Sequence, residues 1–387
     1  MASISMKPGK NENTSPFYSA DLRKIWVTGM VTMFTAIICV VYLLPFGNMA
    51  LLSVKDSEQQ VASATGSILP LSSYTFEYEG EEYDIYTVPL PQEDGSFVDT
   101  EMALVQTGRR VSQFVDVNNP EAGLVEWEGN WRGLEPVTYL DPKWSNFPDA
   151  WNGIEFPRVF RNTLYIAIVG MIGTIISSLL VGYAFARFPI PGKNIMFMIL
   201  IGTIILPGQV TLIPTFAFFN WLTNSMESVL LAMGLPLTLR EPLLAFIAWI
   251  PLTLPHFFSN AYNVFLFRQY FMTLPKELDE AAMIDGAGPL RILMQIIIPL
   301  SWPVIIAVGL FHFIFAWNDY FNPLIYLLNS PELNPISVAV QIFNFQYGAR
   351  PELIQATSLM AMALPIAIFF VAQRIFMKGV ILTGVDK

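Results

Sequence analysis

Uncharged apolar runs alternate with short charged segments along most of this 387-residue chain. Crossing about 30 Å of hydrocarbon takes roughly 20 helical residues, and six runs without Asp, Glu, Lys or Arg are long enough. They span residues 25–53, 162–186, 194–226, 242–267, 292–318 and 353–373. The pattern predicts an all-α polytopic membrane protein with six transmembrane helices. A further uncharged stretch, 228–239, is too short and contains Gly234 and Pro236, so we expect an interfacial or re-entrant piece there.

A different pattern fills the loop after the first run. From 71 to 139, short β-prone segments alternate with turn residues, and strands are expected at 74–78, 83–88, 102–106, 111–117 and 124–127. Their separators are hairpin signals: Glu79-Gly80, Glu93-Asp94-Gly95, Thr107-Gly108 and Asn118-Asn119-Pro120. The loop is therefore predicted to carry a small antiparallel β module. A simple solvent-facing shield that binds no ligand would satisfy this pattern as well as a binding domain would.

Composition agrees with a bilayer environment and locates the acidic charge. Hydrophobic residues make up 53% and charged residues 13% of the chain, too apolar for an ordinary soluble protein. Residues 54–157 hold 19 acidic and 5 basic side chains, more net negative charge than the whole chain's −10. A nucleic-acid partner is therefore disfavoured. The expected organisation is an N-terminal tail (1–24), a first transmembrane helix (25–53), an acidic β-rich insertion (54–157) and a five-helix core (158–387).

Basic residues set the predicted orientation, because short cytoplasmic loops hold an excess of Lys and Arg. Placing both termini in the cytoplasm collects twelve basic residues on that side: Lys7, Lys10, Arg23, Lys24, Arg187, Lys193, Arg268, Lys276, Arg291, Arg374, Lys378 and Lys387. The opposite short loops hold only Arg240 and Arg350. We therefore expect a multi-pass protein of the cytoplasmic (inner) membrane.

The chain offers little to hold a metal ion. Cys39 is the single cysteine, so an intrachain disulfide is impossible. The two histidines, His256 and His312, both lie in apolar runs and form no H-E-x-x-H arrangement. No metal site is expected, and no residue is assigned a catalytic role.

Prolines predict breaks inside two of the runs. Leu206-Pro207-Gly208-Gln209, with Pro214, interrupts the third run near its middle, and Pro251 with Pro255 interrupts the fourth. Broken helices around a cavity are typical of transporters, because the freed backbone groups need protein or water as partners. Adaptation of packing would explain any single proline equally well.

The loop 268–299 separates the fourth and fifth runs, and its sequence predicts a short rigid helix. Pro275 suits a first helical turn, and Glu277, Asp279 and Glu280 follow near the positive end of the helix dipole. Ala281 and Ala282 favour helix and let a partner approach closely. Gly286 suits the left-handed position after a helix, and Gly288-Pro289 prevents continuation. A solvated connector would also fit these properties.

The spacing of this loop resembles a known signature. Glu280-Ala281-Ala282, Gly286, Ile296, Ile298 and Pro299 match the E-A-A-x3-G-x9-I-x-L-P loop of binding-protein-dependent ABC importer permeases, with Ile298 in place of Leu. Further segments resemble the maltose-type carbohydrate permeases, specifically their G-type subunit. They are 161–164, 206–214, 317–320 and 373–379, and the resemblance covers 25–53 and 158–387. The β module departs from that family's short first loop.

The resemblance implies an ATP-driven sugar importer. Such a permease pairs with a second homologous permease, two cytoplasmic ATPase subunits and an extracytoplasmic solute-binding protein. This chain has no G-x-x-x-x-G-K-[S/T] loop, so ATP and Mg²⁺ are expected on the partner ATPase, with no cofactor or enzymatic activity here. The residues expected to meet the ATPase are Glu277, Asp279, Glu280, Ala281, Ala282, Asp285 and Gly286.

Polar side chains inside spans are costly, so they are candidates for the sugar path. The candidates are Gln209, Asn260, Asn263, Trp317, Asn318 and Asp319. Each could instead join helices through hydrogen bonds.

Three other functions fit parts of the sequence. A cation-coupled secondary sugar carrier would use Asp319 and need no ATPase. An ABC permease for a non-sugar solute would keep the same loop. A membrane-anchored receptor would use the β module alone, although six spans exceed what anchoring needs.

Overall fold

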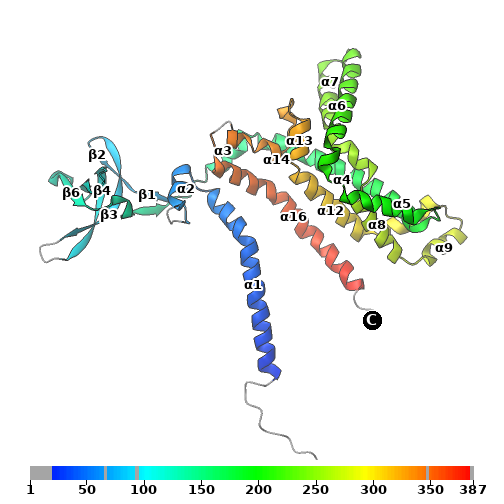
Figure 1. Ribbon diagram of the computed structural model, residues 1–387, viewed down its shortest axis with the longest axis horizontal. Coiled ribbons are helices and arrows are strands. Elements are labelled where there is room, and N and C mark those ends of the chain that lie inside the picture. The colour runs from blue at the N-terminus through cyan, green and yellow to red at the C-terminus, as the bar shows by residue number, and fades with distance from the viewer. Residues whose placement is uncertain (1–19, 65–67, 92–95, 346–347, 384–387) are drawn as a thin grey trace, which may run out of the picture. The chain divides into compact units, whose positions relative to one another are not determined.

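The computed structural model describes residues 20–64, 68–91, 96–345 and 348–383, with the backbone alone for 20–22, 62–64, 209 and 374–383. Lys7, Lys10, Lys387 and the turn Glu93-Asp94-Gly95 lie outside the described residues. The chain divides into two compact units, Met1–Lys143 and Trp144–Lys387. It is mostly helical, with a small antiparallel sheet near the N-terminus, as predicted (Figure 1).

The first unit begins with the long apolar helix α1 (Ala20–Leu52). Its segment Arg23–Leu52 is long and apolar enough to cross a membrane. Almost every described side chain along it is exposed, which suits a helix whose solvent is lipid. The short helix α2 (Ser57–Ala64) follows.

The β module contains all five predicted strands. β2 (Thr75–Tyr78), β3 (Glu81–Pro91), β4 (Phe97–Gln106), β5 (Val111–Asp116) and β6 (Leu124–Glu128) form an antiparallel sheet in that order. The predicted hairpin turn Glu79-Gly80 has φ of 55° and 86°, the two left-handed residues that a two-residue turn between twisted strands requires. Sequence reasoning missed the short β1 (Leu71–Ser73), β7 (Glu135–Pro136) and β8 (Thr138–Leu140).

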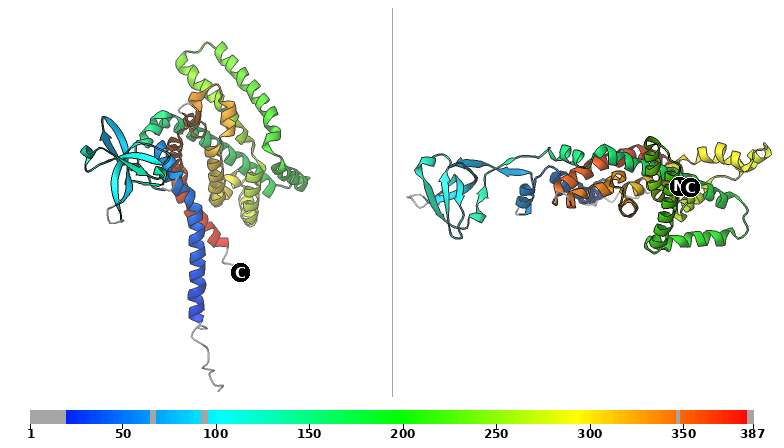
Figure 2. Two further views of the ribbon diagram at one scale, coloured as in Figure 1. Left: turned by 60° about the vertical axis from the view of Figure 1, so that its left-hand side comes forward. Right: turned by 90° about the horizontal axis from the view of Figure 1, so that it is seen from above.

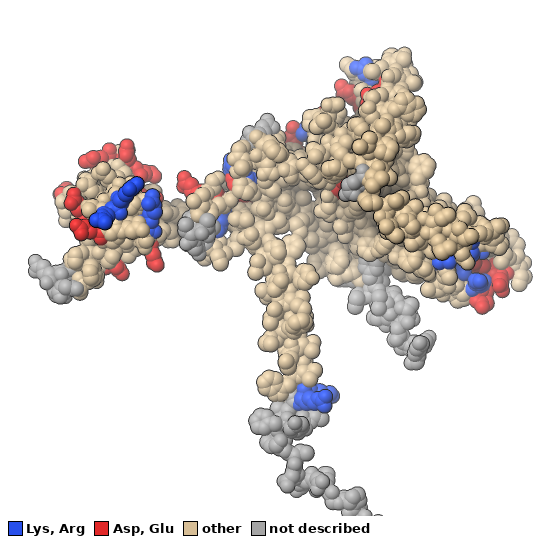
Figure 3. All heavy atoms as spheres, in the orientation of Figure 1, with Lys and Arg blue, Asp and Glu red and all other residues tan. Residues whose placement is uncertain are grey.

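A small core holds the sheet together. Val88, Met102, Leu104 and Phe114 are buried, and the ring of Trp127 meets Phe114 edge-on at 6.1 Å between centroids. Acidic side chains surround this core on the visible surface of the module (Figure 3).

The two ends of the module are fastened beside the end of α1. β1 pairs with β8, and the Lys143 amide donates to the Val54 carbonyl at 2.8 Å. The Lys143 ammonium pairs with the carboxylates of Asp141 and Asp56, and Ser72 Oγ donates to Asp141 at 2.8 Å. The two ends of the module therefore lie close together.

The second unit is helical, and its elements follow one another with short connections. They are α3 (Asn146–Gly153), α4 (Phe156–Arg187), α5 (Lys193–Gly202), α6 (Gly208–Ala232), α7 (Leu237–Thr253), α8 (Ala261–Thr273), α9 (Glu277–Ile284), α10 (Pro289–Ile292), α11 (Ile298–Leu300), α12 (Trp302–Asn318), α13 (Phe321–Tyr326), α14 (Ile336–Ala339), α15 (Ile342–Phe345) and α16 (Pro351–Thr383). α6 and α7 pack against each other (Figure 2). Residues 144–157, expected within the insertion, belong to this unit.

α4 is the central helix of this unit and packs against α7, α8, α12 and α14. Glycines make the close approach possible. A Cβ on Gly173 would lie 2.6 Å from the Phe257 ring, and one on Gly182 would lie 2.7 Å from the Phe267 Cβ. Small residues at helix contacts are the usual way for membrane helices to pack closely.

Two of the six predicted spans are bent. The third bends by 96° between 193–205 and 210–232, at the predicted Leu206-Pro207 break, and the fifth bends by 80° at Ser301. Among the described residues, four helices can cross a membrane, or up to six if each bent pair is one span. Residues 228–239, expected to be an interfacial or re-entrant piece, end α6, turn at Gly234 (φ 62°) and Pro236, and begin α7. Their position relative to the membrane stays a prediction.

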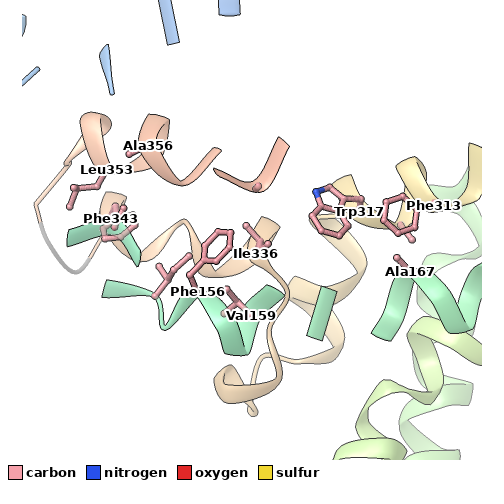
Figure 4. Close-up of a cluster of buried hydrophobic side chains, with 13 residues drawn as sticks. Phe156, Val159, Ala167, Phe313, Trp317, Ile336, Phe343, Leu353 and Ala356 are labelled. Atoms are coloured by element: carbon pink, nitrogen blue, oxygen red, sulfur yellow. The ribbon is translucent and has the colours of Figure 1, made fainter. Parts of the chain in front are cut away.

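One hydrophobic core of the second unit gathers side chains from α3, α4, α12 and α14–α16 (Figure 4). Phe156, Val159, Phe313, Ile336 and Leu353 are buried in it. A second core, here called the α9-side cluster, is formed by Leu179, Tyr183, Phe267, Phe271, Ile292, Leu293, Ile297, Val304, Ile305 and Val308. This cluster lies beneath α9.

Candidate functional site

The predicted rigid helix exists as α9. It begins at Glu277, after Pro275 and Lys276, with Glu277, Asp279 and Glu280 in its first turn. The Gly286 amide donates to the Met283 carbonyl at 3.0 Å, and the Ala287 amide donates to Ala282 at 2.9 Å. With Gly286 at φ 79°, these two bonds form the Schellman ending, which satisfies carbonyls left free at a helix C-terminus.

The two faces of α9 differ. Asp279 and Ala282 face the rest of the unit, and Ala282 packs on the α9-side cluster. The other face is exposed to solvent, with Ile284 86% exposed. It combines acidic, small and apolar residues: Glu277, Glu280, Ala281, Met283, Ile284, Asp285 and Gly286. Acidic and basic side chains gather at this end of the unit (Figure 3). Their predicted contact with an ATPase stays a prediction.

Asp279 is held inward by an ion pair. Its carboxylate lies 2.8 Å from Arg187 Nε, with the side chains 12% and 6% exposed. Arg187 Nη2 also donates to the Leu274 carbonyl at 3.0 Å, and Tyr183 Oη donates to the Pro289 carbonyl at 3.3 Å. Arg187 is the last residue of α4. The loop that carries α9 is therefore fastened to α4 on both sides of the helix.

Sequence reasoning missed this pair. It counted Arg187 only among the cytoplasmic basic residues and Asp279 only among the residues meeting a partner. An arginine that ends an apolar helix needs a carboxylate if it is to be buried. That requirement was the available signal, although it does not say which carboxylate is used.

The chain that leaves α9 is irregular. Between α10 and α11, residues Leu293–Ile297 form the π-helical segment η6, and Ser301 then joins α11 to α12. The end of the signature, Ile296, Ile298 and Pro299, falls here. π-Segments of this kind are frequent at functional sites. Tyr270 Oη donates to the Leu300 carbonyl at 2.9 Å, which ties α8 to this bend.

The fourth span is also interrupted, close to its centre. After α7, a 3₁₀ turn, η5 (Leu254–Phe258), leads to Ser259 with φ 61°. Asn260 then caps α8, because its Oδ1 accepts the Asn263 amide at 2.9 Å. The predicted break is therefore confirmed at Pro255, whereas Pro251 lies inside α7 and does not interrupt the helix.

Two histidines lie beside this break. The rings of His256 and His312 are 4.4 Å apart between centroids. Thr174 Oγ1 and His312 Nδ1 are 3.0 Å apart, and Ser177 Oγ donates to the His256 carbonyl at 3.1 Å. Among the described residues, no group of three or more His, Cys, Asp or Glu side chains could hold a metal ion.

The predicted path residues do not gather in one place. Asn260 is exposed and Asn263 buried at the break. Trp317 is buried in the core of Figure 4, stacked on Phe313 at 5.3 Å. Asn318 is exposed and ends α12. Asp319 follows as the C-cap residue, and its carboxylate accepts a hydrogen bond from the Asn322 side chain at 2.9 Å. The Gln209 side chain lies outside the described residues.

Apolar helices of membrane length, two of them joined through a short anchored helix with one exposed face, define a polytopic membrane-transport subunit. Residues 175–381 match the family described as binding-protein-dependent transport system inner membrane component. This chain belongs to that family. It is thus a membrane-embedded, multi-pass permease subunit of an ABC transporter and not itself an enzyme.

Curated relatives support the assignment. The osmoprotective compounds uptake permease protein GgtD of Synechocystis sp. is 28% identical over 74% of this chain and 89% of its own length. The sn-glycerol-3-phosphate transport system permease protein UgpE of Rhizobium meliloti is 32% identical over 60% of this chain and 74% of its own.

A solved structure supports the fold. A chain from a bacterial ABC transporter involved in the import of the acidic polysaccharide alginate aligns with 93% of this chain and 99% of its own length. The TM-score is 0.56 at 19% identity.

Proposed function

We propose that this chain is the permease subunit of an ATP-driven, binding-protein-dependent importer for a carbohydrate. The UgpE relatives are named for sn-glycerol 3-phosphate, a phosphorylated polyol that shares hydroxyl groups with sugars. An importer for a non-sugar solute is the alternative that the same loop allows. Six spans with both termini cytoplasmic, counting each bent pair once, are part of the proposal.

One observation carries the coupling role: α9 is a rigid helix whose outer face is free and whose inner face is fixed. On the exposed face, Glu280 presents a negative charge to a cytoplasmic ATPase, and the small Ala281 lets the ATPase approach closely. Ile284 adds exposed apolar area that a partner could bury. Its inner residue Asp279 is bound to α4. A partner that grips the outer face can therefore move the spans rather than only the loop.

In the proposed cycle, closure of two ATPase subunits displaces α9 in this chain and its equivalent in a second, homologous permease. The spans rock, and the path opens toward an extracytoplasmic solute-binding protein. ATP and Mg²⁺ would be held by the ATPase subunits, with no cofactor on this chain. The bends at Pro207 and Ser301 mark where spans can change direction.

Reconstitution tests the proposal. The permease, its copurified ATPase and the binding protein are placed in liposomes, and sugar-stimulated ATP hydrolysis is measured together with uptake. Uptake that follows ATP and survives an ionophore is expected, whereas uptake abolished by the ionophore without ATP dependence would indicate a secondary carrier. Glu280→Lys should leave membrane insertion intact and abolish uptake, and normal uptake in that variant would contradict the role of α9.

We also propose that the acidic module contacts the solute-binding protein or the neighbouring permease. Its negative charge and its joined ends at Val54 and Lys143 support an anionic docking element. Crosslinks from module cysteines to the purified binding protein or to the second permease are expected. Absence of both kinds of crosslink, with transport unchanged after deletion of the module, would refute this role.

A further inference from the structure

A two-stranded ribbon, β1 paired with β8, joins the acidic sheet to the end of α1. Figure 1 shows β1 beside α2, and the Gln59 side chain of α2 donates to Ser72 Oγ of β1 at 2.8 Å. The ribbon differs in composition from the sheet beyond it. Residues 59–76 and 136–140 contain no Asp, Glu, Lys or Arg, whereas residues 77–135 between them are strongly acidic. The negative charge of the module therefore begins only where the ribbon ends.

Apolar and aromatic side chains of the ribbon are uncovered. Leu140 on β8 is 63% exposed, and Ile68 and Leu69, just before β1, are also exposed. The rings of Tyr74 and Tyr139 lie 4.7 Å apart between centroids, and both are partly open to solvent. These five residues are here called the ribbon patch. A two-stranded ribbon is only marginally stable in water, and exposed apolar patches mark contacts with a membrane or another protein.

The length of α1 sets the depth of the ribbon patch. The membrane-crossing part of α1, Arg23–Leu52, has 30 residues. At about 1.5 Å per residue it is about 45 Å long, which matches a bilayer with both headgroup layers, about 40–45 Å. With the exposed side chains of Arg23 and Lys24 in one headgroup layer, Leu52 reaches the other. The residues that follow Leu52 therefore start at the membrane surface.

The ribbon stays near that level. The Lys143 amide donates to the Val54 carbonyl at 2.8 Å, and Gln59 Nε2 donates to the Asp141 carbonyl at 2.9 Å. Tyr139 follows within about 7 Å of Asp141, at about 3.3 Å per strand residue. Figures 1 and 2 show the ribbon running across the axis of α1, within the same unit, rather than along it. When α1 crosses the bilayer, the ribbon consequently follows the membrane surface.

The chemistry of the ribbon patch suits lipid headgroups. Tyrosine is enriched at both surfaces of a membrane, because its ring is apolar and its hydroxyl is polar. Leucine and isoleucine beside it add area that the acyl boundary can cover. The acidic sheet would be repelled by anionic headgroups, so the uncharged ribbon is the part of the module that can enter this layer. A protein could also cover apolar residues, but the depth set by α1 favours lipid.

We propose that the ribbon patch inserts into the headgroup layer of the bilayer on the side away from the N-terminus, which is the outer leaflet in the proposed orientation. The ribbon is then a second membrane contact of the first unit, besides α1. It holds the base of the acidic sheet at the membrane surface, so the sheet cannot turn freely about the end of α1.

Lipid-borne quenchers test the position of the ribbon patch. The copurified transporter is placed in nanodiscs of phosphatidylcholine and phosphatidylglycerol that carry a nitroxide on the lipid headgroup. Because Cys39 is the only cysteine, Cys39→Ser gives a background without thiols, and a fluorophore is attached at Leu69→Cys or Leu140→Cys. Leu124→Cys, an exposed leucine on β6 of the acidic sheet, is the matched control. We expect the nitroxide to remove most of the fluorescence at 69 and 140, and little of it at 124.

Iodide, a quencher dissolved in water, distinguishes the other occupants. Fluorophores at 69 and 140 that are quenched by iodide and not by the lipid nitroxide would place the ribbon patch in water. Fluorophores that neither quencher reaches would place it against protein. Equal quenching by the lipid nitroxide at 124 would mean that the acidic sheet lies on the membrane as closely as the ribbon does. Each of these three results overturns the proposal.

Two substitutions separate membrane contact from folding. Leu140→Asp and Leu140→Lys both replace an apolar side chain with a charge, so damage to the ribbon itself would affect them alike. In headgroups that contain phosphatidylglycerol they differ, because the aspartate is repelled and the lysine ammonium can reach the lipid phosphates. Leu140→Asp should therefore reduce quenching of the fluorophore at 69 by the lipid nitroxide, and Leu140→Lys should retain it. Equal quenching in the two variants would overturn the lipid contact.

Discussion

Removing one partner of the Arg187–Asp279 pair should release α9 from α4. The two charges are 2.8 Å apart and nearly buried. At an effective dielectric constant of about 20, unit charges at this distance attract by about 6 kcal/mol, much of which desolvation offsets. Leaving one charge buried without its partner costs about 3–5 kcal/mol. Because α9 is short and joined to its neighbours by loops, we expect this loss of stability to appear as local opening of α9 rather than as global unfolding.

Hydrogen exchange of the α9 amides in nanodiscs measures that opening. In Asp279→Asn and in Arg187→Gln, the amides of residues 280–287 should exchange at least about 100-fold faster, because about 3 kcal/mol of local stability is lost. The double variant should lose less than the sum of the two, since the amide side chains can bond to each other and no charge is left buried. The same variants should hydrolyse ATP with reduced transport per ATP.

Glu277→Gln is the matched control, because it removes an exposed carboxylate from the same helical turn. Its α9 amides should exchange as in the wild type. An exposed ion pair contributes only about 0–1 kcal/mol. If Asp279→Asn increased the exchange rates of the α9 amides by no more than such a loss implies, the pair would not be what holds α9. Additive losses in the double variant would also refute the interaction.

Three further predictions follow from the structure. Gly286→Ala should destabilise the end of α9 by about 1–2 kcal/mol, because φ is 79° and an L-residue is strained there. An added Cβ would meet no other atom, so backbone strain is the whole cost. Faster hydrogen exchange of the α9 amides is expected, and unchanged exchange would contradict the prediction. Gly173→Ala should lower the unfolding temperature, costing about 1–3 kcal/mol, with Phe257→Ala relieving the clash; an unchanged temperature would contradict the packing. Lys143 and Ser72 lower the pKa of Asp141 below 3.8, and Asp141 raises the pKa of Lys143 above 10.5. Their stabilisation of the module should be complete at neutral pH, fall as acid protonates Asp141 and fall as base neutralises Lys143, whereas Asp141→Asn should flatten this profile in limited proteolysis.

Local rules predicted the features that depend on a few neighbouring residues. Gly286 ends α9 and Glu79-Gly80 turns a hairpin because only certain residues tolerate positive φ at low cost. Pro207 and Pro255 mark breaks because proline removes a hydrogen-bond donor. The five longer strands were found from alternation with turn residues.

Features that depend on distant residues were not predictable in the same way. Trp317 has a polar neighbour in sequence, Asn318, yet its ring is buried against Phe160 and Phe313. The hydropathy of 228–239 does not distinguish a separate re-entrant piece from the ends of two helices. Both arrangements are uncharged, and both can contain a turn at Gly234, whose φ is 62°. Arg187 and Asp279 are far apart in sequence, and only the tertiary fold brings their side chains together.

α4 connects the candidate coupling helix to the break. Its last residue, Arg187, binds Asp279 of α9, and its middle residues Gly173 and Ser177 hold the broken segment. Ser177 and Arg187 are separated by about 15 Å of continuous helix, at about 1.5 Å per residue. A helix transmits displacement along its axis better than a loop does, because each residue is fixed by backbone hydrogen bonds. Movement of α9 therefore has a direct route through α4 to the break in the fourth span, besides the covalent routes through α8 and through the bend at Ser301.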